Sequence, residues 1–114
     1  MSLSLTLVFD KFRRALDNDP IYASNRLKFE GDALRLSEAL KPVALPLTAG
    51  VEWLSEDQGL KLFKTDPYDD DLTFVSAGLL APRLQDAAQG AWGRAVLAFV
   101  QTLPADTRVV LWWD

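Results

Sequence analysis

The chain of 114 residues contains no histidine and no cysteine. Without histidine it lacks the usual general base near neutral pH, any Ser-His-Asp triad and every imidazole metal ligand. Without cysteine it has neither a disulfide framework nor the ordinary ligands of zinc and iron–sulfur sites. A catalytic site would have to use carboxylates, lysine, tyrosine, serine or arginine. This inventory favours a protein that performs no catalysis and holds no metal and no cofactor.

Long apolar runs are also lacking. No stretch approaches the roughly 18 apolar residues of a membrane-spanning helix. Residues 1–9 are apolar, but they carry no positive charge, and no cleavage site of small residues follows them. We interpret them as a strand rather than as a signal peptide. We therefore expect a cytoplasmic protein that does not contact a membrane.

The overall charge is mildly acidic, with 16 acidic and 12 basic side chains and a formal net charge of −4. An acidic domain repels phosphate backbones on average, so we expect no nucleic-acid partner. Apolar residues make up 49% of the chain and charged residues 25%, which is typical of globular proteins. Because 114 residues is a usual domain length, we predict a single domain over residues 1–114.

Alternation of apolar and polar residues predicts strands, since successive side chains of a strand point to opposite faces. The pattern is clear within residues 3–9, at Leu3, Leu5 and Leu7, and we also predict strands over residues 51–55, 60–64, 72–76 and 108–113. Segments 51–55 and 60–64 flank a polar turn that ends in Gly59, which predicts a hairpin. Apolar residues on both faces of 108–113 predict either a central strand or a strand with an exposed face used for binding.

The segment over residues 26–37 has two interpretations. Leu27 and Phe29 alternate with polar residues, as do Leu34 and Leu36, and this predicts a second hairpin. The alternative is a helix over residues 33–41 that Asp32 caps and a proline ends. Two prolines, Pro42 and Pro46, then predict an edge strand or an extended linker.

Helical periodicity predicts a short helix over residues 10–17 and a long one over about 82–103. The long helix has an apolar stripe at three- and four-residue intervals, formed by Leu84, Ala88, Trp92, Ala95, Phe99 and Leu103. Gly90 and Gly93 inside it indicate close approach to a sheet or to another chain. The predicted fold class is α+β: a mainly antiparallel sheet of five or six strands, with a short N-terminal helix, the long helix packed across it, and a C-terminal strand.

A polar loop at residues 65–71 is the first candidate site. Its clustered aspartates suit Ca²⁺ or Mg²⁺, but their spacing differs from that of an EF-hand and no glycine lies in mid-loop. We therefore interpret the loop as a solvated acidic turn rather than a metal site. An exposed acidic loop with a tyrosine also suits contact with a basic partner. The candidate partner-binding residues here are Asp66, Tyr68, Asp69, Asp70 and Asp71.

Two adjacent tryptophans, Trp112 and Trp113, are the second candidate site. Neighbouring side chains of a strand point to opposite faces, so we expect one ring in the core and the other toward solvent or a partner. Tryptophan is enriched in binding hot spots, and both residues are therefore candidate partner-binding residues. Trp92, by contrast, is expected in the core.

These features together predict a small acidic protein-binding module, of the inhibitor or immunity type, that occludes a basic partner. One alternative is a homodimeric adaptor or secretion-chaperone-like protein, joined through the long helix or the last strand. Another is a carboxylate-based enzyme or small-ligand binder, which predicts a pocket of several hundred Å³ with convergent charged groups. The binding module instead predicts a flat or convex face with aromatic and acidic side chains.

Overall fold

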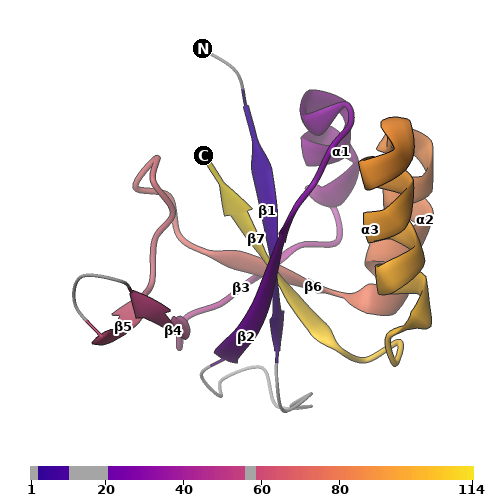
Figure 1. The fold of residues 1–114 in the computed structure, drawn as a ribbon. Coiled ribbons are helices and arrows are strands. Elements are labelled where there is room, and N and C mark those ends of the chain that lie inside the picture. The colour runs from indigo at the N-terminus through magenta and orange to yellow at the C-terminus, as the bar shows by residue number, and fades with distance from the viewer. Residues whose placement is uncertain (1–2, 11–20, 56–58) are drawn as a thin grey trace.

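The computed structural model describes residues 3–10, 21–55 and 59–114. It is an α+β fold with a layer of helices on one face of a sheet (Figure 1). The strands are β1 (Leu5–Asp10), β2 (Ile21–Lys28), β3 (Leu45–Pro46), β4 (Val51–Ser55), β5 (Gly59–Phe63), β6 (Thr73–Ser76) and β7 (Arg108–Trp113), and the helices are α1 (Ala33–Leu40), α2 (Ala77–Ala87) and α3 (Gly90–Thr102).

The sheet has the strand order β3-β6-β7-β1-β2-β4-β5. Its first five strands are antiparallel, and β7 lies between β6 and β1, which confirms the predicted central C-terminal strand. The predicted hairpin of β4 and β5 is confirmed, and β4 joins β2 through a short parallel pairing at Ile21–Val51 and Tyr22–Glu52. The proline-flanked stretch forms the edge strand β3. The predicted helix at 10–17 lies, apart from Asp10, outside the described residues.

The predicted second hairpin is wrong, and the alternative helix is right. Residues 33–40 form α1, and the Asp32 carboxylate accepts a hydrogen bond of 3.1 Å from the backbone N–H of Arg35. This cap satisfies one of the free amides that open a helix. Leu36 and Leu40, four residues apart, are buried, whereas Leu34 is 66% exposed. The burial follows a helical period, not a strand period.

The predicted long helix is interrupted, and the chain forms α2 and α3 instead. Ala88 and Gln89 between them have extended backbone angles, and Gly90 has a φ of +72°. The extended residues pair with the segment after β2, because Gln89 N donates to Glu30 O at 3.1 Å. Pairing with distant backbone thus overrides local helix propensity. Gly93 confirms the expected close approach, since a Cβ there would collide with Glu30 O.

Because of this interruption, the face of α3 that is buried differs from the predicted apolar stripe. The buried residues of α3 are Gly93, Val96 and Val100. The predicted core position of Trp92 is wrong: it is 48% exposed, and its indole N–H donates to Lys28 O at 2.6 Å. Phe99 is 37% exposed and packs edge-on against Phe9, with ring centroids 4.9 Å apart.

Apolar residues fill both faces of the sheet. The larger cluster lies under the helices and includes Leu5, Leu7, Leu80 and Leu84. The smaller cluster lies on the opposite face and comprises Val8, Leu47, Val51, Leu72, Phe74 and Val110, with Phe63 and Trp112 partly buried against it. Phe63 and Leu72, which flank residues 64–71, both pack in this smaller cluster and therefore lie close to the sheet. None of the described helices is long and apolar enough to cross a membrane.

A buried ion pair joins the C-terminal end of β1 to the N-terminal end of β7. Arg108 Nη2 and Nε lie 2.8 and 3.0 Å from Asp10 Oδ2, and the two side chains are 3% and 0% exposed. The Arg108 guanidinium also lies 5.9 Å from the centroid of the Phe74 ring. The pair fixes the register of two central strands without forming part of a cavity among those described.

Candidate partner-binding site

The first candidate site is the loop Lys64–Leu72, here called the acidic loop, which connects β5 to β6. Its neck is closed by backbone hydrogen bonds from Leu72 N to Lys64 O at 3.0 Å and from Asp66 N to Asp70 O at 2.9 Å. A bridge between Thr65 and Asp71 continues the ladder. The neck of the loop is therefore a short antiparallel pairing of its own, since β5 and β6 are not neighbours in the sheet.

Asp66 shapes the tip from inside. Its side chain is buried at 7% exposure, and Oδ1 accepts hydrogen bonds from Tyr68 N at 2.9 Å and Asp70 N at 3.2 Å. Aspartate before proline is typical of such a turn, because its carboxylate binds backbone amides two or more residues ahead. Asp66 thus holds the loop in shape, while the other candidate residues of the loop form its outer surface.

The outer surface of the acidic loop carries three exposed carboxylates, those of Asp69, Asp70 and Asp71. None of the three side chains forms a hydrogen bond or ion pair with the described part of the chain. Asp69 has a φ of +63°, a left-handed conformation that aspartate adopts more readily than most residues. Tyr68 beside it is 39% exposed. The turn thus presents one aromatic ring and three uncompensated negative charges.

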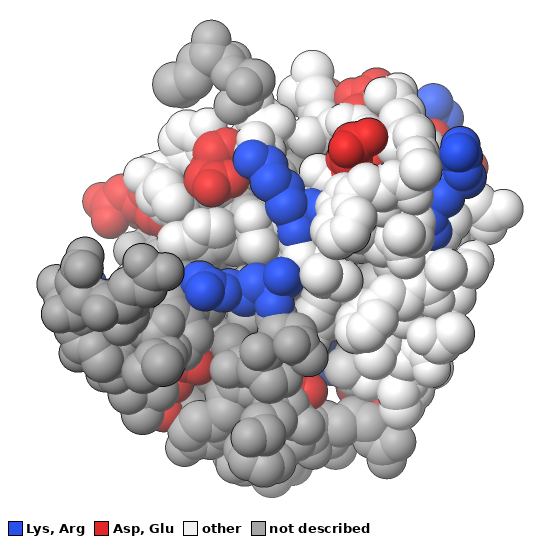
Figure 2. Space-filling view, in the orientation of Figure 1, with Lys and Arg blue, Asp and Glu red and all other residues white. Residues whose placement is uncertain are grey.

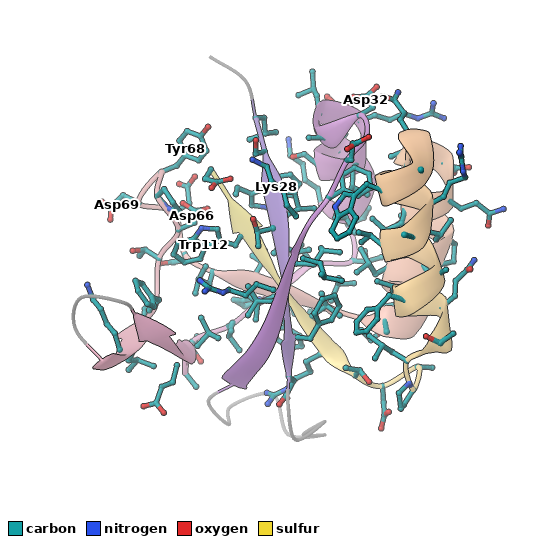
Figure 3. All side chains as sticks on the ribbon, viewed as in Figure 1. Lys28, Asp32, Asp66, Tyr68, Asp69 and Trp112 are labelled. Atoms are coloured by element: carbon teal, nitrogen blue, oxygen red, sulfur yellow. The ribbon has the colours of Figure 1, made fainter. Side chains whose placement is uncertain are left out.

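The figures place this surface at one end of the sheet. In Figure 3, Tyr68 and Asp69 point away from the sheet, and Asp66 lies between the loop and Trp112. Acidic side chains gather at the upper left of Figure 2, where Figure 1 draws the acidic loop beside the C-terminal end of β7. Basic side chains cross the centre of the same face, and one of them lies directly beside the acidic group.

The two tryptophans lie on opposite faces of β7, as predicted, but both are half-buried. Trp112 packs against Phe63 in an edge-on contact of 5.5 Å between ring centroids. It therefore belongs to the face that carries the acidic loop. Trp113 packs on the helix-side core. The structure thus brings Trp112, but not Trp113, to the face of the loop residues.

Surface hollows in the described part of the chain are small. One of about 270 Å³ lies between α2 and α3, and one of about 260 Å³ lies between α1, β6 and β7. A third, of about 190 Å³, is lined by Pro46, Leu47, Thr48, Lys64, Asp71 and Leu72 at the base of the acidic loop. All three fall below the roughly 300 Å³ at which pockets for drug-sized ligands begin. Within the described side chains, no group of three acidic residues is placed to hold a metal ion.

The hollow at the base of the acidic loop is the feature that sequence reasoning missed. Residues 46–48 reach it only because β3 pairs with β6, which places Leu47 N 2.9 Å from Leu72 O. No local pattern in residues 45–48 indicates this proximity. The edge-strand prediction for Pro46 was the nearest signal, but it did not identify the partner strand.

The fold and the site together define an α+β protein with a rigidly closed acidic loop and no large pocket among those described. Comparison of the chain with protein-family models, with curated proteins and with solved structures found no match. The functional argument therefore rests on the residues of the site alone.

Proposed function

We propose that this protein is a protein-binding module that contacts a basic partner through its acidic loop. The observation that supports the proposal most directly is the set of three exposed carboxylates, Asp69–Asp71, that form no ion pair with the described residues. Like charges at adjacent positions repel one another, and a positively charged partner surface relieves that repulsion. The structural role of Asp66 supports the same reading, because the loop is shaped before any partner arrives.

A loop that is already ordered loses little conformational entropy on binding, so more of the contact energy becomes affinity. Complementary charge also speeds association and selects among partners. Tyr68 supplies an aromatic side chain at the centre of the charged surface, and tyrosine is enriched among residues that dominate binding energy. The mechanism we propose is steric occlusion, in which the protruding acidic loop covers a basic site on the partner.

The experiment is an affinity capture from lysate of the source organism with three forms of the purified protein as bait. The first is the native chain, and the second carries Asp69→Asn and Asp70→Asn. The third is a matched control with Glu38→Gln and Asp86→Asn, which removes two exposed carboxylates from α1 and α2. We expect a basic protein, identified by mass spectrometry, to be captured by the native and control forms and lost from the loop variant. Equal capture by all three forms would refute the acidic loop as the contact.

A second candidate function is a homodimeric adaptor, and one observation favours it. Trp92 and Phe99 lie seven residues apart on α3 and are both partly exposed, with the exposed Ala95 between them. Of the two surfaces expected for a dimer, the edges of β7 are already paired with β1 and β6, so α3 is the one that is left. Light scattering of the native protein and of Trp92→Glu decides this case. A dimer that becomes a monomer in the variant would support the adaptor function.

A further inference from the structure

We infer that the hollow at the base of the acidic loop is the seat for a single arginine side chain of the basic partner. This inference rests on the proposed function and specifies its contact. The hollow has a volume of about 190 Å³, below the roughly 300 Å³ at which pockets for drug-sized ligands begin, and we therefore assign to it one long side chain. It opens directly beside Asp71, so one partner segment can contact the acidic loop and fill the hollow at once.

The lining of the hollow is divided into an apolar floor and a charged rim. Leu47 and Leu72 form the floor, since both line the hollow and are at most 2% exposed. They belong to the smaller core, so the floor is rigid. The rim consists of exposed residues, Pro46, Thr48, Lys64 and Asp71. This division matches a side chain with an apolar stem and a charged head.

The charges of the rim residues determine which charged end group of a side chain fits the hollow. Asp71 has no hydrogen bond or ion pair among the described side chains, and Asp69 and Asp70 extend the negative potential outward. A guanidinium suits this place better than an ammonium for two reasons. It donates two parallel N–H hydrogen bonds to a carboxylate, and it is more weakly hydrated, so it loses less hydration energy when it lies on an apolar floor.

Lys64 provides an internal test, because it lines the same hollow with the opposite charge. If the occupant is cationic, Lys64 repels it and Asp71 attracts it. The two residues must then have effects of opposite sign on the affinity. An anionic occupant would reverse both signs, and a purely apolar occupant would respond to neither substitution.

The experiment is a titration of the ¹⁵N-labelled protein with short peptides, followed by amide chemical shifts. The probes are acetyl-Leu-Arg-Leu-amide and its counterparts with lysine, norleucine or glutamate at the centre. We expect the arginine peptide to shift the amides of Leu47, Thr48 and Leu72 and to bind more tightly than the other three. Asp71→Asn should raise its Kd, and Lys64→Gln should lower it, each by about two- to fivefold, the range of partly exposed charge pairs.

Three results would overturn the inference. The first is that the norleucine peptide binds as tightly as the arginine peptide, and the second is that the glutamate peptide binds more tightly. The third is that the amides of Leu47, Thr48 and Leu72 do not shift at about 10 mM arginine peptide. Failure here is distinct from failure of the proposed function. If capture of a basic protein depends on Asp69 and Asp70 but is unchanged in Asp71→Asn, the binding module stands and the arginine seat is refuted.

Discussion

The buried pair of Asp10 and Arg108 makes the sharpest stability prediction for this fold. Both hydrogen bonds of the pair end on one oxygen, Asp10 Oδ2, and both side chains are almost completely buried. We consider Arg108→Met, which keeps the aliphatic length of the side chain, Asp10→Asn, which keeps its shape, and the double variant. Each single substitution removes one charge of the buried pair, and the double substitution removes both charges.

The expected magnitude follows from the burial of the pair. Breaking a buried ion pair by removing one partner costs about 3–5 kcal/mol, because the remaining charge stays out of water. Domains of this size have unfolding free energies of about 5–15 kcal/mol, so each single variant should lose at least about a fifth of the stability. Replacing both charges is often close to neutral. Since each residue makes a further interaction outside the pair, the double-mutant cycle is needed to isolate the mutual contribution.

The assay is urea unfolding followed by tryptophan fluorescence. With an m value of about 1.5 kcal/mol per molar urea, the single variants should unfold at a urea concentration about 2–3 M lower than the native protein. The double variant should be more stable than the sum of the two losses implies, by at least about 1 kcal/mol. A loss below about 1 kcal/mol in Arg108→Met, typical of an exposed pair, would refute the reasoning.

Three further predictions concern other contacts. Gly93→Ala should lower Tm by at least about 4 °C, although glycine to alanine normally stabilises a helix, because the added Cβ meets Glu30 O; a higher Tm would contradict the packing described. Asp66→Ala should cost about 1–3 kcal/mol and speed amide exchange at Tyr68 and Asp70, whereas an unchanged exchange rate would show that its carboxylate does not hold the loop. Trp92→Phe removes one hydrogen bond at a half-exposed site and should cost no more than about 1.5 kcal/mol in the same urea assay; a larger loss would show that this ring is part of the core.

Sequence patterns identified the strands because the burial of alternate side chains is a local property. Strand β7 was recognised from apolar residues on both faces, whereas β1, recognised from alternation, is buried at five of its six residues. The segment after β2 was ambiguous, since Leu34 and Leu36 satisfy a period of two while Leu36 and Leu40 satisfy a helical period. The Asp32 cap and the burial of Leu40 decide in favour of the helix.

Features that depend on distant segments were not predictable in this way. The break between α2 and α3 exists because Gln89 pairs with Glu30, far away in the chain, and Gly90 was its only local sign. The acidic loop itself was recognised from its composition. That Asp66 points inward while its neighbours point outward could be seen only in the three-dimensional structure.

The most direct test of the account is site-specific photo-crosslinking in cells of the source organism. A photoreactive phenylalanine analogue replaces Tyr68 at the centre of the acidic loop, and a matched variant carries it at Leu34, an exposed residue of α1. The account predicts that the probe at position 68 forms an adduct with a basic protein and that the probe at position 34 does not. No adduct at position 68, or the same adducts from both positions, would contradict the central claim that the acidic loop is the binding surface.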